Sequence, residues 1–203
     1  MTRRRISAPD RVLLLLTGLV AAYQVAVGIN GLGVLAILAY TVAFGVLLMA
    51  ALLLIIFGFD ILESPLVVIV AAIVPLSLSL GLVLEYIPAW GAAYLAFTIL
   101  GLAGIATTRY AAAGRVATIV LALVHGIAGL LIFALPVVWS LLGRAPLGFA
   151  VVGAGGALIG AAGLLLAFLK AGRPILPKDT IFAVLPGLLL LMTAAFVAGL
   201  AMG

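Results

Sequence analysis

The stretch VLLLLTGLVAAYQVAVGINGLGVLAILAYTVAFGVLLMAALLLIIF, residues Val12–Phe57, decides the fold because it contains no charged residue. As a single α-helix it would be about 69 Å long, at a rise of ~1.5 Å per residue. The hydrocarbon core of a bilayer is only about 30 Å thick, and ~20 apolar residues cross it. The stretch must therefore turn back on itself, and the cluster Asn30-Gly31-Leu32-Gly33 predicts where it turns. We expect one transmembrane helix on each side of this turn.

The composition of the whole chain indicates that lipid is its solvent. Of the 203 residues, 68% are hydrophobic and 7% are charged, and the mean hydropathy is +1.54. A soluble domain has about 25% charged residues because its surface faces water. We therefore expect an all-α, polytopic transmembrane helix bundle that occupies residues 1–203 as a single integral membrane domain.

Seven apolar stretches of the chain are candidates for crossing a bilayer. The shortest is Gly91–Thr107, and without it the chain would have six spans. The predicted spans are Val12–Ile29, Val34–Phe57, Leu66–Leu84, Gly91–Thr107, Val116–Leu135, Leu147–Leu169 and Thr180–Met202.

The basic residues indicate how these spans are oriented. With the N-terminus in the cytoplasm, nine of the ten Lys and Arg residues fall on the cytoplasmic side and only Arg144 falls outside. Cytoplasmic connections are enriched in these residues, and tryptophans are enriched at membrane interfaces. Trp90 and Trp139 both fall at outer connections. We predict a cell-membrane protein with a cytoplasmic N-terminus and a C-terminus outside.

The beginning of the chain allows a second interpretation. Met1–Arg5 is basic and an apolar run follows from Val12, which is also the pattern of a secretory signal peptide. The run is long, however, and no clear small-x-small cleavage site follows it. We expect the first helix to be retained with the arginines as its cytoplasmic anchor, and cleavage is the alternative.

The sequence contains a candidate internal duplication. Residues of the first span recur with the same spacing in the fifth: Thr17, Ala21, Gln24 and Gly28 match Thr118, Ala122, His125 and Gly129. Ala72 and Pro75 of the third span match Ala183 and Pro186 of the seventh. A true duplication would give a 3+1+3 parallel repeat about an axis along the membrane normal, as in some transporters. The alternative is a chance match between segments rich in Ala, Leu and Gly.

Two polar side chains deep in the predicted spans, Gln24 and His125, are candidates for binding a solute. Polar groups are costly in lipid unless they are paired, which makes them site candidates by chemical type. Across a repeat axis the two would face each other and form one small polar spot. The alternative is an interhelical hydrogen bond that only holds the bundle together.

Pro75 and Pro186 are the second pair of candidates, because each lies in the middle of a span. A proline removes a backbone donor, which frees the carbonyl of Ala71 or Phe182 for a solute or for a neighbouring group. The alternative is a static kink, in which a hydroxyl such as that of Ser77 or Ser79 satisfies the carbonyl.

A small-residue face in the sixth predicted span indicates close helix packing. Its members are Gly153, Gly156, Gly160 and Gly163. Small side chains let helix backbones approach closely, either within the bundle or against a second copy of the chain. A phosphate-binding loop is excluded, because no strand precedes the glycines and no Lys or Ser/Thr follows as such a loop requires.

No catalytic, metal or cofactor site is predicted. The chain has no cysteine, and because His125 is its only histidine, bis-histidine haem ligation within one subunit is excluded. Asp60, Glu63 and Asp179 fall on the predicted cytoplasmic face, where they could hold a divalent cation or act as acid and base. Each also lies at the start of a helix, where a carboxylate favours the helix dipole. We expect capping, no metal, no cofactor and no enzymatic activity.

Two classes of function fit these observations. The first is a small carrier or facilitator for a neutral or weakly polar solute; the 3+1+3 layout resembles that of the small sugar carriers called SWEETs, whose proline–glutamine signature is absent here. The second is a non-catalytic structural or assembly subunit of a larger membrane complex. We expect membrane lipids as partners, together with other membrane subunits or a second copy in a homodimer. The net charge of +5 is attributed to anionic lipid headgroups and not to nucleic acid.

Overall fold

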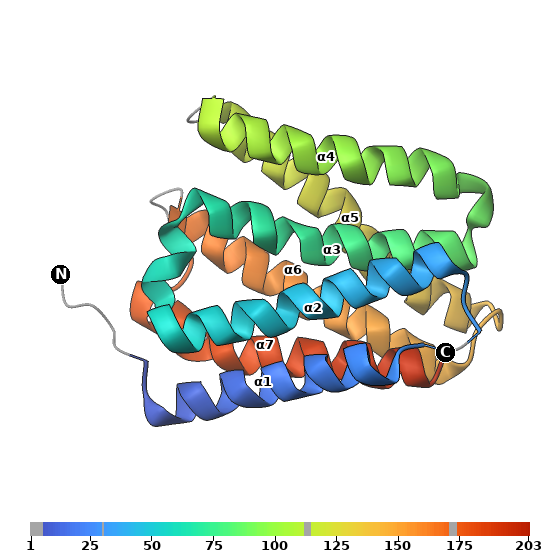
Figure 1. The fold of residues 1–203 in the computed structure, drawn as a ribbon, viewed down its shortest axis with the longest axis horizontal. Helices are drawn as coiled ribbons and strands as arrows, with labels where there is room; N and C mark the ends of the chain where they lie inside the picture. Colours follow the sequence, from blue (N-terminus) through green and yellow to red (C-terminus); the bar gives the residue numbers. More distant parts are fainter. Residues whose placement is uncertain (1–5, 30, 112–114, 171–173) are drawn as a thin grey trace.

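The computed structural model describes residues 6–29, 31–111, 115–170 and 174–203, and all its regular elements there are helices. Seven helices in this part of the chain are long and apolar enough to cross a membrane, which is the architecture of a multi-pass membrane protein (Figure 1). They are α1 (Ala8–Val27), α2 (Val34–Phe57), α3 (Pro65–Tyr86), α4 (Gly91–Ala111), α5 (Arg115–Leu141), α6 (Ala150–Lys170) and α7 (Lys178–Ala201). Three short 3-10 helices join them: η1 (Phe59–Glu63), η2 (Pro88–Trp90) and η3 (Leu147–Phe149).

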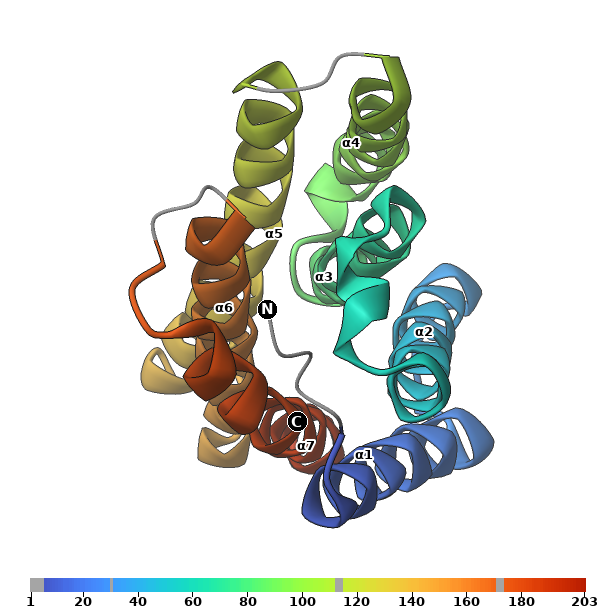
Figure 2. The same cartoon turned by 90° about the vertical axis from the view of Figure 1, so that its left-hand side faces the viewer.

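Six of the seven long helices form a closed ring, and α4 lies outside it (Figure 2). Within the ring α1 packs on α2 and α7, α3 packs on α2 and α5, and α6 packs on α5 and α7. The order around the ring is therefore α1, α2, α3, α5, α6, α7. The peripheral helix α4 packs on α3 and α5.

Large side chains fill the centre of this ring. The main core cluster takes buried residues from all six ring helices and from η3. Its largest members are Tyr40, Phe44, Phe149, Met192 and Phe196, each no more than 3% exposed. A second cluster joins α1, α2, η1, α6 and α7, and a third joins α3 and α5 to α4.

The first two helices show how local sequence sets their ends. A capping box begins α1: Asp10 N–H donates to Ser7 Oγ over 3.3 Å, and Ser7 N–H donates to Asp10 Oδ2 over 3.0 Å. The chain then turns between α1 and α2 at Gly28 and Gly31, whose φ angles of 68° and 84° favour glycine. The turn lies where the sequence predicts it, although Asn30 is outside the described residues.

The helices α1 and α5 have bounds that differ from those of the predicted spans. We expected a first span of Val12–Ile29, but α1 begins at Ala8 and ends at Val27, because the capping box starts it one turn earlier. We expected the fifth span to end at Leu135, but α5 continues through Pro136 to Leu141. Continuing the helix leaves only one backbone hydrogen bond unmade, whereas stopping in lipid would expose several polar groups.

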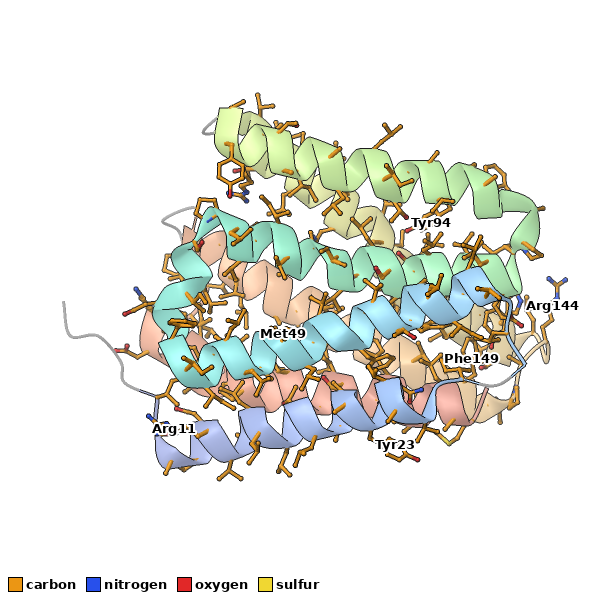
Figure 3. All side chains as sticks on the ribbon, viewed as in Figure 1. Arg11, Tyr23, Met49, Tyr94, Arg144 and Phe149 are labelled. Atoms are coloured by element: carbon orange, nitrogen blue, oxygen red, sulfur yellow. The ribbon has the colours of Figure 1, made fainter. Side chains whose placement is uncertain are left out.

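The described basic residues are divided unequally between the two ends of the bundle. Consecutive long helices run in opposite directions, so α1, α3, α5 and α7 all begin at one end (Figure 1). Arg11 lies at that end and Arg144 at the other (Figure 3). Arg109 in the last turn of α4 and Lys178 at the start of α7 lie at the same end as Arg11. The predicted basic residues Arg3, Arg4, Arg5 and Arg173 are outside the described part of the chain.

Candidate functional site

Gln24 lies near the end of α1 and binds its own helix. Its side chain is 8% exposed, and its Nε2 donates a hydrogen bond of 2.9 Å to the carbonyl oxygen of Gly28. A small pocket between α1 and α2 touches it, with room for about one water molecule. The pocket is lined by Gln24, Gly28, Ile29, Ile37, Tyr40, Thr41 and Phe44. The amide thus satisfies a carbonyl at the C-terminus of α1, and we did not foresee this role.

His125 lies on a partly buried face of α5. Ala128 and Ile132, three and seven residues further on, share its helix face and are both fully buried. Ile132 belongs to the cluster that fills the ring. The His125 side chain is partly exposed, but its Nδ1 atom is buried and has no hydrogen-bond partner among the described residues.

The structure does not bring Gln24 and His125 together. Their helices, α1 and α5, are on opposite sides of the ring, because three steps separate them in either direction (Figure 2). Their depths also differ. Gln24 is in the last turn of α1, whereas His125 is about 15 Å from the start of α5 at ~1.5 Å per residue. The small polar spot that we expected from this pair is therefore not present between the described side chains.

Pro75 and Pro186 are buried inside α3 and α7, close to the depth of His125. The neighbour of Pro75, Leu76, packs in one cluster with Val124 and Ala128 of α5, which flank His125. Pro75, His125 and Pro186 lie at similar distances from the starts of their helices. These starts are all at the end of the bundle where Arg11 lies. Three of the four predicted site residues thus share one level of the ring, and Gln24 does not.

A hydroxyl near Pro75 does bind backbone carbonyls, although not the one that we expected. Ser79 Oγ donates to the carbonyl of Pro75 at 2.6 Å and lies 3.1 Å from that of Leu76. It also accepts a hydrogen bond of 2.8 Å from the hydroxyl of Tyr94 on α4. In the alternative of a static kink, a hydroxyl such as that of Ser77 or Ser79 would satisfy the carbonyl of Ala71; the hydroxyl of Ser79 instead binds that of Pro75, one turn further along the helix.

The glycine face of α6 divides into two parts. A Cβ atom at Gly156 would lie 2.8 Å from Phe133 N, and one at Gly153 would lie 2.7 Å from Phe133 O, so both glycines allow close contact with α5. A Cβ atom at Gly160 or Gly163 would have no atom within 4 Å. Gly153 and Gly156 therefore pack within the bundle. At Gly160 and Gly163, contact with a second copy of the chain stays possible.

Two features of the structure have no counterpart in the sequence analysis. One is the bond between Tyr94 and Ser79, which joins α4 to the ring. The other is Arg109, whose Nε is buried and has no hydrogen-bond partner among the described residues. Neither was accessible from a sequence pattern, because each depends on how α4 docks.

The acidic residues do not form a metal site in the described part of the chain, which contains no group of three His, Asp or Glu residues placed to hold an ion. Asp60 lies in the first turn of η1 and Asp179 in the first turn of α7, where a carboxylate favours the helix dipole. The side chain of Glu63 is outside the described residues.

Comparison with known proteins found no matching family model, no matching curated protein and no matching solved structure. Function is therefore inferred from the positions of the side chains alone. Among the described side chains, the imidazole of His125 has a buried Nδ1 atom without a hydrogen-bond partner, well inside the membrane-spanning helix α5.

Proposed function

We propose that the chain is a small carrier or facilitator for a neutral or weakly polar solute, and that His125 contacts the solute from the face of α5 that it shares with Ala128 and Ile132. The buried Nδ1 of His125, which has no partner among the described residues, is the observation that supports this proposal. A polar atom in lipid is costly when it is unpaired, and an imidazole nitrogen can donate or accept a hydrogen bond. A passing solute with a hydroxyl or amide group would supply the missing partner.

The arrangement of the ring also supports a carrier. The contacts within α1–α2–α3 recur in α5–α6–α7, and the two halves meet through α3 with α5 and through α7 with α1. This order fits a parallel repeat about an axis along the membrane normal. In such a repeat Pro75 and Pro186 occupy equivalent positions, and each lies beside residues that pack within the bundle.

We further propose that the N-terminus is cytoplasmic and that the protein resides in the cell membrane. Arg11, Arg109 and Lys178 lie at the end of the bundle where α1 begins, and Arg144 lies at the other end. Positive charges of this kind are retained on the cytoplasmic side. This orientation puts the C-terminus and Arg144 outside.

The second candidate function is a non-catalytic structural or assembly subunit. The filled centre of the ring favours it: Phe196 is fully buried there, and Tyr40 and Phe44 line a pocket beside Gln24 that has space for only about one water molecule. The peripheral helix α4 also exposes Ile99 and Leu100, which a partner could cover as well as lipid.

An osmotic assay with purified protein in liposomes separates the two functions. Glycerol, urea and glucose serve as neutral probes, and the swelling of vesicles with and without protein is followed by light scattering. The carrier proposal predicts faster uptake of at least one probe, and its loss in His125→Ala. The matched control is Gln24→Met. The side chain of Gln24 bonds to the carbonyl of Gly28 at the end of its own helix, so this variant should keep uptake.

Two results together would contradict a carrier. If no probe enters faster than in empty liposomes, and affinity purification in mild detergent recovers other membrane proteins in stoichiometric amounts, the subunit function replaces it. A loss of uptake in both variants would show that His125 has no special part in the process.

A further inference from the structure

Arg109 is held at the junction of α4 with α3 and α5. It lies in the last turn of α4, one turn after Ile105, which is fully buried and packs with Leu76 and Val124. Residues four apart share a helix face, so Arg109 continues the side of α4 that docks on the ring. The side chain is half-buried and its Nε is completely covered.

The guanidinium of Arg109 has no partner among the described residues. No hydrogen bond or ion pair joins it to another described side chain or carbonyl, and its Nε is one of the buried polar atoms without a partner. An arginine stays protonated in proteins, so it cannot lose its charge as a way to tolerate burial. A partly buried, unpaired cation is costly, and an anion from outside the chain would compensate it.

The helix dipole alone does not explain this arrangement. A basic residue in the last turn of a helix is favourable, and an exposed arginine would gain that benefit equally well. A long side chain normally extends so that its charged end stays in water. Arg109 keeps its Nε covered, whereas its two terminal nitrogens are not among the buried unpaired atoms and can reach an anion outside the chain.

We propose that Arg109 binds the phosphate of an anionic phospholipid at the end of α4. The planar guanidinium matches two phosphate oxygens in a bidentate contact. The position fits a lipid headgroup because Arg109 lies at the end of a span, and α4 is peripheral, so lipid surrounds much of it. Ile99 and Leu100 are 60% and 70% exposed on the same helix, and they provide an apolar surface for acyl chains.

Free phosphate is the second source of the same chemistry, and the experiment distinguishes the two. The full chain is purified in a neutral detergent and titrated with phosphatidylglycerol, with phosphatidylcholine, or with inorganic phosphate. Binding is counted by native mass spectrometry, and thermal stability is followed in parallel. We expect phosphatidylglycerol to bind and to raise the melting temperature, and the other two probes to have little effect.

The variants assign the binding to one residue. Arg109→Gln should weaken phosphatidylglycerol binding by about tenfold, the loss expected for one charged contact. Arg144→Gln is the matched control: this arginine is exposed at the opposite end, where it lies over Trp139, and its loss should leave binding unchanged. Arg109→Lys keeps the charge without the planar fork and should bind at an intermediate level.

Three results would overturn the proposal. Equal binding of phosphatidylglycerol and phosphatidylcholine to the wild-type chain would show no preference for an anion, and this measurement does not depend on any variant folding. Saturation by inorganic phosphate, with no gain from the lipid, would assign the site to a free anion. Equal losses in Arg109→Gln and Arg144→Gln would show general electrostatic attraction in place of a site.

Discussion

The hydroxyl of Tyr94 lies 2.8 Å from the Oγ of Ser79 and donates a hydrogen bond to it, which connects the peripheral helix α4 to α3 (Figure 3). Ser79 Oγ in turn donates to the carbonyl of Pro75. The docking of α4 is thus linked through one hydroxyl to the turn of α3 that contains a proline. Within α4 the rings of Tyr94 and Phe97 form a tilted pair, and about three turns further on Ile105 packs against α3 and α5.

Removing the hydroxyl of Tyr94 should loosen α4. Tyr94→Phe and Ser79→Ala, combined in a double-mutant cycle, should show a coupling free energy of about 1 kcal/mol, a value usual for an interhelical bond in a membrane. Unfolding by denaturing detergent measures it. Tyr23→Phe is the control, because Tyr23 is 59% exposed on the outside of α1. A coupling indistinguishable from zero would show that packing alone holds α4.

Two glycines of α6 should respond in opposite ways to the same substitution. Gly156→Ala places a Cβ 2.8 Å from Phe133 N and 2.9 Å from Ile132 C, so α5 and α6 must separate and the protein should lose about 1–3 kcal/mol of stability. Gly160→Ala meets no atom within 4 Å and should be neutral or stabilising, because alanine favours a helix by ~1 kcal/mol. Thermal unfolding in detergent measures both. Destabilisation by Gly160→Ala would indicate that a second copy packs there.

Replacing Gln24 by a methionine of similar shape should have a small effect. Gln24→Met removes the bond to the Gly28 carbonyl, which is worth ~1 kcal/mol in a membrane protein. The adjacent pocket has room for about one water, which can take over part of that bond. Hydrogen exchange at the end of α1 should increase while global stability falls by less than ~1 kcal/mol. A global loss of several kcal/mol would show that Gln24 has contacts beyond its own helix.

Single cysteines should be labelled from opposite sides of the membrane. The chain has no native cysteine, so a thiol reagent that does not cross the membrane has no background. Arg144→Cys should react in intact cells, and Tyr110→Cys, at an exposed position near the other end, should react only after the membrane is opened. Labelling of Tyr110→Cys in intact cells would reverse the proposed orientation.

The transmembrane helices could be predicted from sequence, because apolar length alone determines them in a bilayer. The seven expected spans correspond to seven helices long enough to cross, and Gly91–Thr107 proved to be part of α4. The start of α1 at Ala8 could also be predicted, because Ser7, Pro9 and Asp10 form a capping signal. The predicted span followed the apolar run instead and began at Val12. The passage of α5 through Pro136 was not, since proline usually ends a helix in water.

The candidate site could be predicted only in part. His125 and the two prolines are distinguished by residue type, and the sequence identifies them without a structure. The separation of Gln24 from His125 depends on the order of helices around the ring, which apolar sequence does not encode. In a membrane, faces toward lipid and faces toward protein are both apolar, so periodicity does not distinguish them. For the same reason, no pattern revealed that α4 stands outside the ring.

The position of α4 makes the two junctions between the halves of the ring unequal. It packs on both α3 and α5 and so bridges that junction, whereas no third long helix in the described part of the chain packs on both α1 and α7. In the carrier that we propose, a rocking motion of the two halves would pivot about the junction of α3 with α5, and the gate would lie between α1 and α7.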